Sequence, residues 1–197
     1  MRAMAAMKIY LRRSMFLMGA GVLIVMLCIG LYLGAEQLTG NFHAVLSGQV
    51  YRSGQPTPSE IASYQKAFGI RTIVNLRGEN RGRAWYDDEV AESEKLGITH
   101  VDFRMSAKAQ FTQQQAESLI AILQTVEKPV RIHCEGGADR SGLAAALYLA
   151  AVAKLGEEAA ESQISLLYGH VSLPIAGAYA IDRSWEGLEP WLGFHDS

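Results

Sequence analysis

The chain has 197 residues, of which 49% are hydrophobic and 19% are charged, and its formal net charge is −2 at pH 7. These values describe a packed globular protein and exclude an intrinsically disordered chain. The length fits one domain with an additional segment. The two cysteines are Cys28 and Cys134, which excludes a disulfide-rich framework.

The first element in chain order is an uncharged apolar run over residues 14–35. The charged residues that precede it are all cations: Arg2, Lys8, Arg12 and Arg13. A helix of this length spans a hydrocarbon core of about 30 Å, whereas the apolar part of a signal peptide usually has only about 7–15 residues. We therefore predict a basic cytoplasmic segment 1–13, a transmembrane signal anchor 14–35 and a soluble domain 36–197.

The charge on either side of the apolar run predicts its orientation. By the positive-inside rule the N-terminus stays in the cytoplasm and the domain is exported, to the periplasm if the source is a bacterium. The alternative is a long signal peptide cleaved after Ala35, which would release the domain. Subtracting the four N-terminal cations from 18 Lys and Arg leaves 14 against 20 Asp and Glu, or −6 for residues 36–197. We expect no nucleic-acid partner for so acidic a domain.

Short β-prone segments alternate with helical segments through most of the domain. We predict strands at residues 43–46, 50–52, 71–76, 98–103 and 130–133, the first two as a hairpin. We predict helices at residues 58–68, 86–96, 113–126, 141–155, 157–167 and 176–191. Thr57 and Thr112 are predicted N-caps, each followed three residues later by Glu or Gln. The alternation predicts an α/β fold with a central, mostly parallel sheet flanked by helices.

The most informative segment joins the strand that ends at His133 to the next helix. Cys134 follows that strand, and two glycines, Arg140 and Ser141 lead into the helix. A helix N-terminus presents unpaired N–H groups and a partial positive charge, and glycines let successive N–H groups surround an anion. Arginine adds a planar fork that binds two phosphate oxygens. The same field favours the thiolate of Cys134, so the segment predicts a nucleophile beside a bound phosphate.

This segment resembles a known signature. Its string HCEGGADRS, residues 133–141, is similar to the Cys-x5-Arg-Ser/Thr signature of the cysteine-dependent protein tyrosine phosphatases, in the form typical of dual-specificity phosphatases. YRSGQP at residues 51–56 and IVNLRGE at residues 73–79 resemble the atypical dual-specificity branch of bacteria, plants and fungi. The resemblance covers roughly residues 42–150.

The resemblance implies hydrolysis in two steps through a cysteinyl-phosphate, without a metal or another cofactor. It implies Cys134 as nucleophile, Arg140 as phosphate-binding residue and Ser141 as the residue that assists departure of the sulfur. The implied phosphate loop consists of Cys134, Glu135, Gly136, Gly137, Ala138, Asp139 and Arg140. From its position we assign His133 to holding this loop by backbone hydrogen bonds.

Other loop residues receive weaker assignments. Arg77 is the leading candidate for a contact at the pocket mouth because it follows a strand end, ahead of Arg52, Arg81 and Arg83. His100 and His170 are interpreted as packing or surface residues. The sequence shows no cluster with the spacing of metal ligands.

The sequence departs from the family at the general acid. The family commonly places an aspartate on the loop between the second of the predicted parallel strands and the helix before the cysteine, but residues 104–111 contain no Asp or Glu. A general acid is typically worth about 10²–10⁴-fold in rate. Three alternatives stay open: Asp102 at the strand end, Asp139 inside the phosphate loop, as in myotubularin-type loops, or no acid at all, which suits a phenol leaving group.

We therefore predict a membrane-anchored phosphatase acting on phosphotyrosine, together with phosphoserine and phosphothreonine if it has dual specificity. Its partners would be a phosphorylated protein or a small phosphomonoester, and the membrane. The negative charges of Glu135 and Asp139 favour a protein substrate. The alternatives are an inositol phosphate or phosphoinositide phosphatase, and a phosphate-binding module with little turnover.

Overall fold

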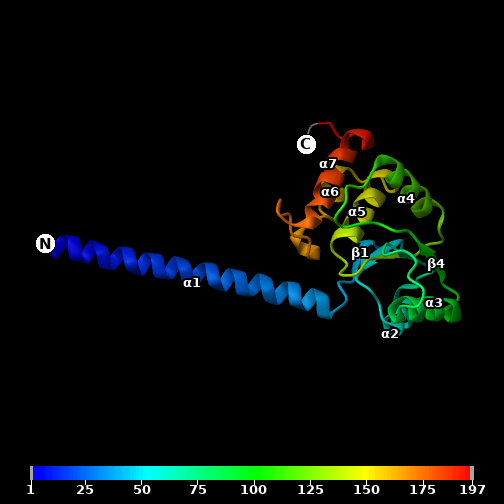
Figure 1. Ribbon diagram of the computed structural model, residues 1–197, viewed down its shortest axis with the longest axis horizontal. Helices are drawn as coiled ribbons and strands as arrows, with labels where there is room; N and C mark the ends of the chain where they lie inside the picture. The colour runs from blue at the N-terminus through cyan, green and yellow to red at the C-terminus, as the bar shows by residue number, and fades with distance from the viewer. Residues whose placement is uncertain (1, 196–197) are drawn as a thin grey trace. The chain divides into compact units, whose positions relative to one another are not determined.

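The computed structural model describes residues 2–195, and the chain forms two compact units that meet between Leu38 and Thr39. The first unit is the helix α1 (Arg2–Leu38), drawn in blue in Figure 1. Its part from Arg13 to Leu38 is long and apolar enough to cross a membrane, a property that a signal sequence shares. The predicted apolar run 14–35 lies within it.

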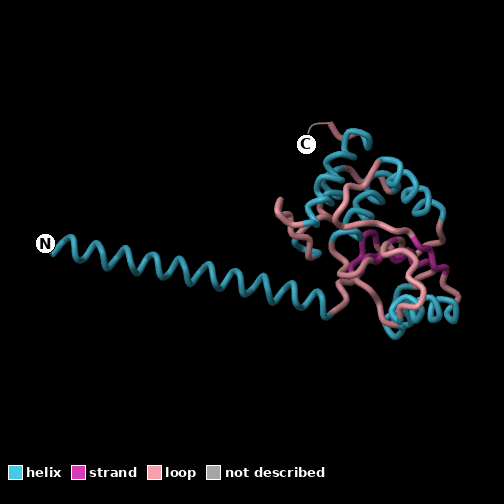
Figure 2. The backbone as a smooth tube through the Cα atoms, in the orientation of Figure 1, coloured by secondary structure: helices cyan, strands magenta, loops and turns pink. Residues whose placement is uncertain are grey.

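The second unit is built on one five-stranded sheet (Figure 2). Its strands are β1 (His43–Leu46), β2 (Val50–Ser53), β3 (Thr72–Asn75), β4 (Thr99–Asp102) and β5 (Val130–His133). They lie in the order β1-β2-β5-β3-β4. Only the β1–β2 pair is antiparallel, as the hairpin prediction requires, and β2, β5, β3 and β4 run parallel. The predicted α/β fold with a mostly parallel central sheet is confirmed.

Helices cover both faces of the sheet (Figure 1). One face carries α2 (Pro58–Phe68) and α3 (Ala84–Leu96), and the other carries α4 (Gln113–Thr125), α5 (Asp139–Leu147), α6 (Glu157–Glu161) and α7 (Ala180–Leu192). Successive strand residues point to opposite faces, so in β3 Ile73 packs in the α2–α3 core and Val74 in the core under α4, α5 and α7. Both side chains are fully buried.

Both predicted N-caps are confirmed, and each of them forms a capping box. The Thr57 hydroxyl accepts from the Glu60 N–H at 3.3 Å, and the Glu60 carboxylate accepts from the Thr57 N–H at 2.7 Å. Thr112 and Gln115 make the same reciprocal pair at the start of α4. Each pair satisfies backbone donors that a helix leaves unpaired at its N-terminus.

The structure corrects the predicted helices after the Cys134 loop. The predicted helix 141–155 begins two residues earlier, so that Asp139 and Arg140 lie in the first turn of α5, and it ends in a π-turn at Tyr148–Val152. Lys154 and Gly156 have φ values of 53° and 88°, which stop a right-handed helix.

The next two predicted helices are also shorter. The predicted helix 157–167 ends at Glu161, and the carbonyl of Gln163 accepts from the Arg52 guanidinium instead of from a helix N–H. Residues of the predicted helix 176–191 form a 3₁₀ turn, Gly177–Tyr179, before α7 begins at Ala180.

Strand register gathers polar residues at one edge of the sheet. His133 at the end of β5 is paired with Ser53 of β2 and with Asn75 of β3, and Asn75 is paired with Asp102 of β4. The parallel strands therefore end together, at the edge where α/β proteins bind ligands.

Candidate active site

Cys134 directly follows β5, and its side chain is only 2% exposed. The backbone N–H of Gly137 donates to its sulfur at 3.2 Å, and the hydroxyl oxygen of Ser141 lies 3.5 Å from the same sulfur. An N–H and a hydroxyl at these distances stabilise negative charge on sulfur. The structure thus brings together three of the residues that the sequence assigned to one site.

Arg52 of β2 lies fully buried behind the loop. Its Nη2 atom donates to the carbonyl oxygens of Gly137 at 3.0 Å and Ala138 at 2.8 Å. The N–H of a trans peptide unit points opposite to its carbonyl, so the N–H groups of Ala138 and Asp139 point away from Arg52. Burial lowers the pKa of Arg52 to about 10, and nearby Cys134 opposes this, so the guanidinium is positively charged at neutral pH.

Close backbone contacts explain the glycine at position 137. Gly137 has φ of 75°, which favours glycine. A Cβ atom there would lie 2.5 Å from the backbone nitrogen of Gly54 and 2.7 Å from the carbonyl carbon of Ser53. Asn41 supports the same turn, because its side-chain amide donates to the carbonyl of Gly136 at 3.0 Å and to that of Tyr168 at 2.9 Å.

A cavity of about 410 Å³ opens beside the loop. It is lined by Arg140, Glu135 and the residues 104–108 that precede α4. An Nη2 atom of Arg140 lies 3.9 Å from the exposed carboxylate of Glu135. The Nε atom of Arg140 is buried and has no hydrogen-bond partner among residues 13–195.

Arg77 reaches the same carboxylate from the end of β3. Its guanidinium lies over the Trp85 ring at 3.5 Å, donates to the side chain of Gln55 at 2.8 Å and lies 3.9 Å from Glu135. Glu135 therefore faces two guanidinium groups. Arg77 itself does not line the 410 Å³ cavity, and its contact at the pocket mouth stays a prediction.

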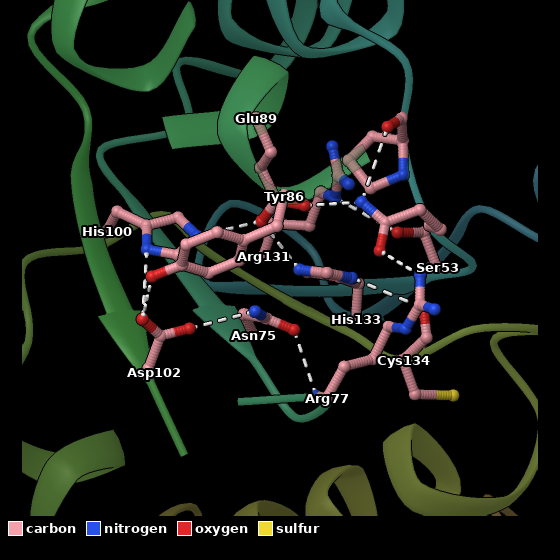
Figure 3. Close-up of polar contacts among 12 residues, drawn as sticks. Ser53, Asn75, Arg77, Tyr86, Glu89, His100, Asp102, Arg131, His133 and Cys134 are labelled. Carbon is pink, nitrogen blue, oxygen red and sulfur yellow. Dashed lines mark hydrogen bonds and ion pairs between the residues drawn. The ribbon is translucent and has the colours of Figure 1, made fainter. Parts of the chain in front are cut away.

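A buried carboxylate, that of Glu89, contacts the residue that precedes Cys134 (Figure 3). Glu89 of α3 is fully buried, and its Oε1 lies 2.8 Å from Nε2 of His133 and 2.9 Å from Nε2 of His100. Nδ1 of His133 lies 3.3 Å from the carbonyl oxygen of Cys134. Although burial by itself raises the pKa of Glu89, the two histidines hold it below its usual range.

Comparison with known proteins assigns the family. The family model PTP-SAK, described as Swiss Army Knife protein, DSP-PTPase phosphatase domain, matches residues 40–175. The chain belongs to this family. It is a cysteine-based phosphatase domain of the dual-specificity type. No curated protein sequence matches the chain.

Solved phosphatases share the fold of this domain. TpbA of P. aeruginosa has 24% identity and a TM-score of 0.59, over 79% of this chain and 92% of that chain. A putative DUF442 phosphatase of Shewanella putrefaciens CN-32 has 19% identity and a TM-score of 0.58, over 80% and 92%. The catalytic core of the PP-IP phosphatase SIW14 of S. cerevisiae has 15% identity and a TM-score of 0.57, over 78% and 93%.

Neither candidate acid of the phosphatase lies free beside the cysteine. Asp102 ends β4, where its Oδ1 accepts from the Asn75 amide at 2.8 Å and its Oδ2 from the Tyr86 hydroxyl at 2.5 Å (Figure 3). Asp139 turns toward the C-terminal part of the domain, and its Oδ1 lies 2.7 Å from Nδ1 of His170. The structure thus gives each carboxylate other partners, and the choice of acid stays a prediction.

His170 is a buried residue that the sequence left as packing or surface. Its Nε2 lies 3.0 Å from Asp182, so carboxylates face both ring nitrogens. Burial lowers the pKa of His170, but the hydrogen bond and charge of Asp139 and those of Asp182 raise it above its ordinary value. The pair with Asp139 ties the first turn of α5 to the segment before α7.

Sequence reasoning missed most of the groups that hold the loop from behind. It left Arg52 among the mouth arginines and did not single out Asn41, Glu89 or Gln163. The position of Arg52 within YRSGQP was the one available signal. Among the side chains of residues 13–195, no group of three from His, Cys, Asp or Glu could hold a metal ion.

Proposed function

We propose that the domain hydrolyses phosphotyrosine monoesters through a cysteinyl-phosphate. The Cys134 thiolate attacks phosphorus, a sulfur–phosphorus bond forms, and the bond from phosphorus to the phenolic oxygen breaks. Water then attacks the cysteinyl-phosphate, releasing phosphate and the thiolate, while the Ser141 hydroxyl donates to the departing sulfur. Arg140 and the loop N–H groups hold the phosphate oxygens. The observation that carries this proposal is the set of donors around the Cys134 sulfur.

The preference for an aryl ester rests on the leaving group. Residues 104–111 contain no carboxylate, both oxygens of Asp102 accept hydrogen bonds, and Asp139 faces His170. A phenol leaves with less help from a general acid than the alcohol of serine or threonine does. TpbA, which shares the fold, was crystallised with phosphotyrosine. These points favour phosphotyrosine over phosphoserine and phosphothreonine.

A second candidate is an inositol phosphate or phosphoinositide. Arg104 and Lys108 line the cavity together with Arg140, and these cations suit a substrate with more than one phosphate. SIW14, another protein of this fold, is described as a PP-IP phosphatase. Inositol phosphates are alkyl esters, whose alcohol leaves less readily than a phenol does. This candidate therefore depends more strongly on a general acid, and residues 104–111 contain none.

We also propose that α1 is an uncleaved anchor that places the phosphatase domain outside the cytoplasm, in the periplasm if the source is a bacterium. The helix from Arg13 to Leu38 has the length and apolarity of a membrane span, and its flanking charges follow the positive-inside rule. Intact mass of the protein from membranes tests this. Retention of residues 1–35 supports an anchor, and a mass that lacks them would show a cleaved signal peptide.

The substrate proposal is tested with the full chain in detergent and three substrates: a tyrosine-phosphorylated peptide, its phosphoserine counterpart and a phosphoinositide in mixed micelles. We expect the highest kcat/KM for the phosphotyrosine peptide and no turnover by Cys134→Ser. Turnover that survives this substitution would refute the mechanism. Phosphate binding without turnover would identify a binding module instead.

Lys108→Gln separates the two substrate classes. It should raise KM for the phosphoinositide more than for the phosphotyrosine peptide, because only the former offers further phosphates to the cavity. Lys66→Gln, which replaces an exposed lysine on α2, is the matched control for the loss of one positive charge. A higher kcat/KM for the phosphoinositide in the unsubstituted protein would make the second candidate the function.

A further inference from the structure

The buried carboxylate of Glu89 is connected to two sides of the phosphate loop. Through Oε1 it contacts His133, the residue that precedes the nucleophile. Its Oε2 accepts from the side-chain amide of Gln55, whose own oxygen accepts from Arg77. Arg77 then faces Glu135, the residue that follows the nucleophile. One side chain on α3 is therefore linked to the neighbours of Cys134 on both sides.

The two branches constrain different groups. Both ring nitrogens of His133 face acceptors, the Glu89 carboxylate and the Cys134 carbonyl, so the ring donates to both only when it carries both protons. Burial lowers the pKa of His133 below its ordinary value, although the anionic Glu89 opposes this. The contact with Glu89 fixes the plane of the ring. In the other branch Gln55 is fixed at both ends, because its backbone N–H also donates to the carbonyl of Glu135 at 3.0 Å.

We infer that Glu89 is a positioning residue of the phosphatase, which acts through His133 on the geometry of the Cys134 loop and through Gln55 on Arg77, which faces Glu135. The inference rests on the proposed cysteine-dependent reaction and adds a residue that does not touch the substrate. A buried carboxylate is costly unless it is fully paired, and Glu89 accepts hydrogen bonds at both oxygens. Through its contacts with His133 and Gln55, the buried Glu89 carboxylate affects the geometry of the catalytic loop.

Two other ionisable side chains, those of His100 and Arg131, lie close to Glu89 and His133, and a test of Glu89 must leave them unchanged. His100 of β4 shares Oε1 of Glu89. Arg131 of β5 is fully buried, and its Nε donates to the hydroxyl of Ser53 at 2.9 Å. Burial lowers the pKa of Arg131 to about 10, and Glu89 opposes this. Substitutions that leave His100 and Arg131 in place therefore isolate the contribution of Glu89.

The test uses the full chain in detergent, with Cys28→Ser as background so that Cys134 is the one thiol. Glu89→Gln preserves the shape of the side chain and removes its charge. We measure kcat and KM with p-nitrophenyl phosphate and the pH midpoint of Cys134 alkylation by iodoacetamide. We expect kcat to fall by about 10- to 100-fold, as small misplacements of reacting groups do. The control Glu94→Gln, on the exposed side of the same helix, should match the background protein.

The direction of the alkylation shift distinguishes positioning from charge. Removal of an anion near the thiolate would by itself move the midpoint to lower pH, whereas loss of the aligned loop donors moves it to higher pH. We expect the shift to higher pH. An unchanged or lower midpoint would overturn the inference. This readout needs no turnover, so it stays valid even if the proposed phosphatase reaction fails.

Two further variants test the branches. If Glu89 acts through His133, the double variant Glu89→Gln/His133→Asn should have a kcat no lower than that of the less active single variant. A fold-loss in kcat equal to the product of the two single losses would overturn this branch. Gln55→Leu keeps the Glu89–His133 contact and frees Arg77, so KM should rise while kcat stays within about twofold. This variant tests the Arg77 branch even if Glu89→Gln does not fold, and an unchanged KM would overturn it.

Discussion

Arg52 gives the sharpest test of how the loop is held. Its guanidinium donates to three backbone carbonyls, those of Gly137, Ala138 and Gln163. Arg52→Met keeps the aliphatic volume and removes every one of these donors. A buried acceptor left unpaired costs about 1–3 kcal/mol, so the substitution removes roughly 3–9 kcal/mol before any relaxation. Since a domain is stable by only about 5–15 kcal/mol, we expect a loss of at least about 3 kcal/mol.

Arg52→Lys separates stability from loop geometry. Lysine keeps one positive charge but cannot span two carbonyls with one planar group, so at least one acceptor loses its donor and stability falls by about 1–3 kcal/mol. The N–H groups of Ala138 and Asp139 are then no longer held in place. We expect the inhibition constant of inorganic phosphate to rise at least about tenfold, the equivalent of about 1.4 kcal/mol.

The assays are urea unfolding followed by tryptophan fluorescence and phosphate inhibition of aryl phosphate turnover. Arg71→Met is the matched control, because the Arg71 side chain is exposed and makes an ion pair with Glu127 at 3.9 Å. A folded Arg52→Met protein with unchanged phosphate inhibition would refute the idea that Arg52 orients the loop. Loss of stability with unchanged phosphate inhibition in Arg52→Lys would limit Arg52 to a structural role.

Three other substitutions address the loop and its surroundings. Gly137→Ala should abolish phosphate binding measured by calorimetry. Gly48 has the same φ of 75° and open space around it, so Gly48→Ala should leave phosphate binding unchanged and lower stability only by the left-handed strain of about 1–2 kcal/mol. Equal effects of the two substitutions on phosphate binding would argue against the backbone clash. His170 has a raised pKa, so its stabilisation is fully present below its unfolded pKa and is lost as pH rises through the folded value. The Tm gap to His170→Gln should therefore be larger at pH 5.5 than at pH 8.5, and a gap that grows with pH would contradict this sign. In pH–rate profiles of Asp102→Asn and Asp139→Asn, only loss of the true acid should flatten the alkaline limb, and if neither does, the phenol leaves unaided.

Local signals in the sequence were sufficient to predict the elements that flank Cys134. The strand at 43–46 and the strand at 130–133 have the predicted bounds, and both capping boxes form. These features depend on residues that are close in the chain: β-branched runs, cap residues and glycines. The Cys134 loop belongs to the same class, because its strand, glycines, arginine and helix start are contiguous in sequence.

The interactions behind the loop could not be predicted in this way. Arg52 and Gly137 are 85 residues apart, and Asn41 and Tyr168 are 127 apart. An arginine in a strand next to a turn reads as a surface charge, because burial of its guanidinium is favourable only when distant carbonyls converge on it. The shortening of the predicted helix 157–167 has a related origin, since Arg52 binds the carbonyl of Gln163.

The loop string alone therefore does not specify an anion site. Its donors are backbone N–H groups, and their direction is set by what holds the opposite carbonyls, Arg52 for Gly137 and Ala138 and Asn41 for Gly136. Glu89 contacts His133 at the end of the strand that precedes Cys134. A sequence with Cys134 and Arg140 but without these buried partners would keep those two side chains and lose the orientation of the backbone N–H groups that the proposed reaction requires.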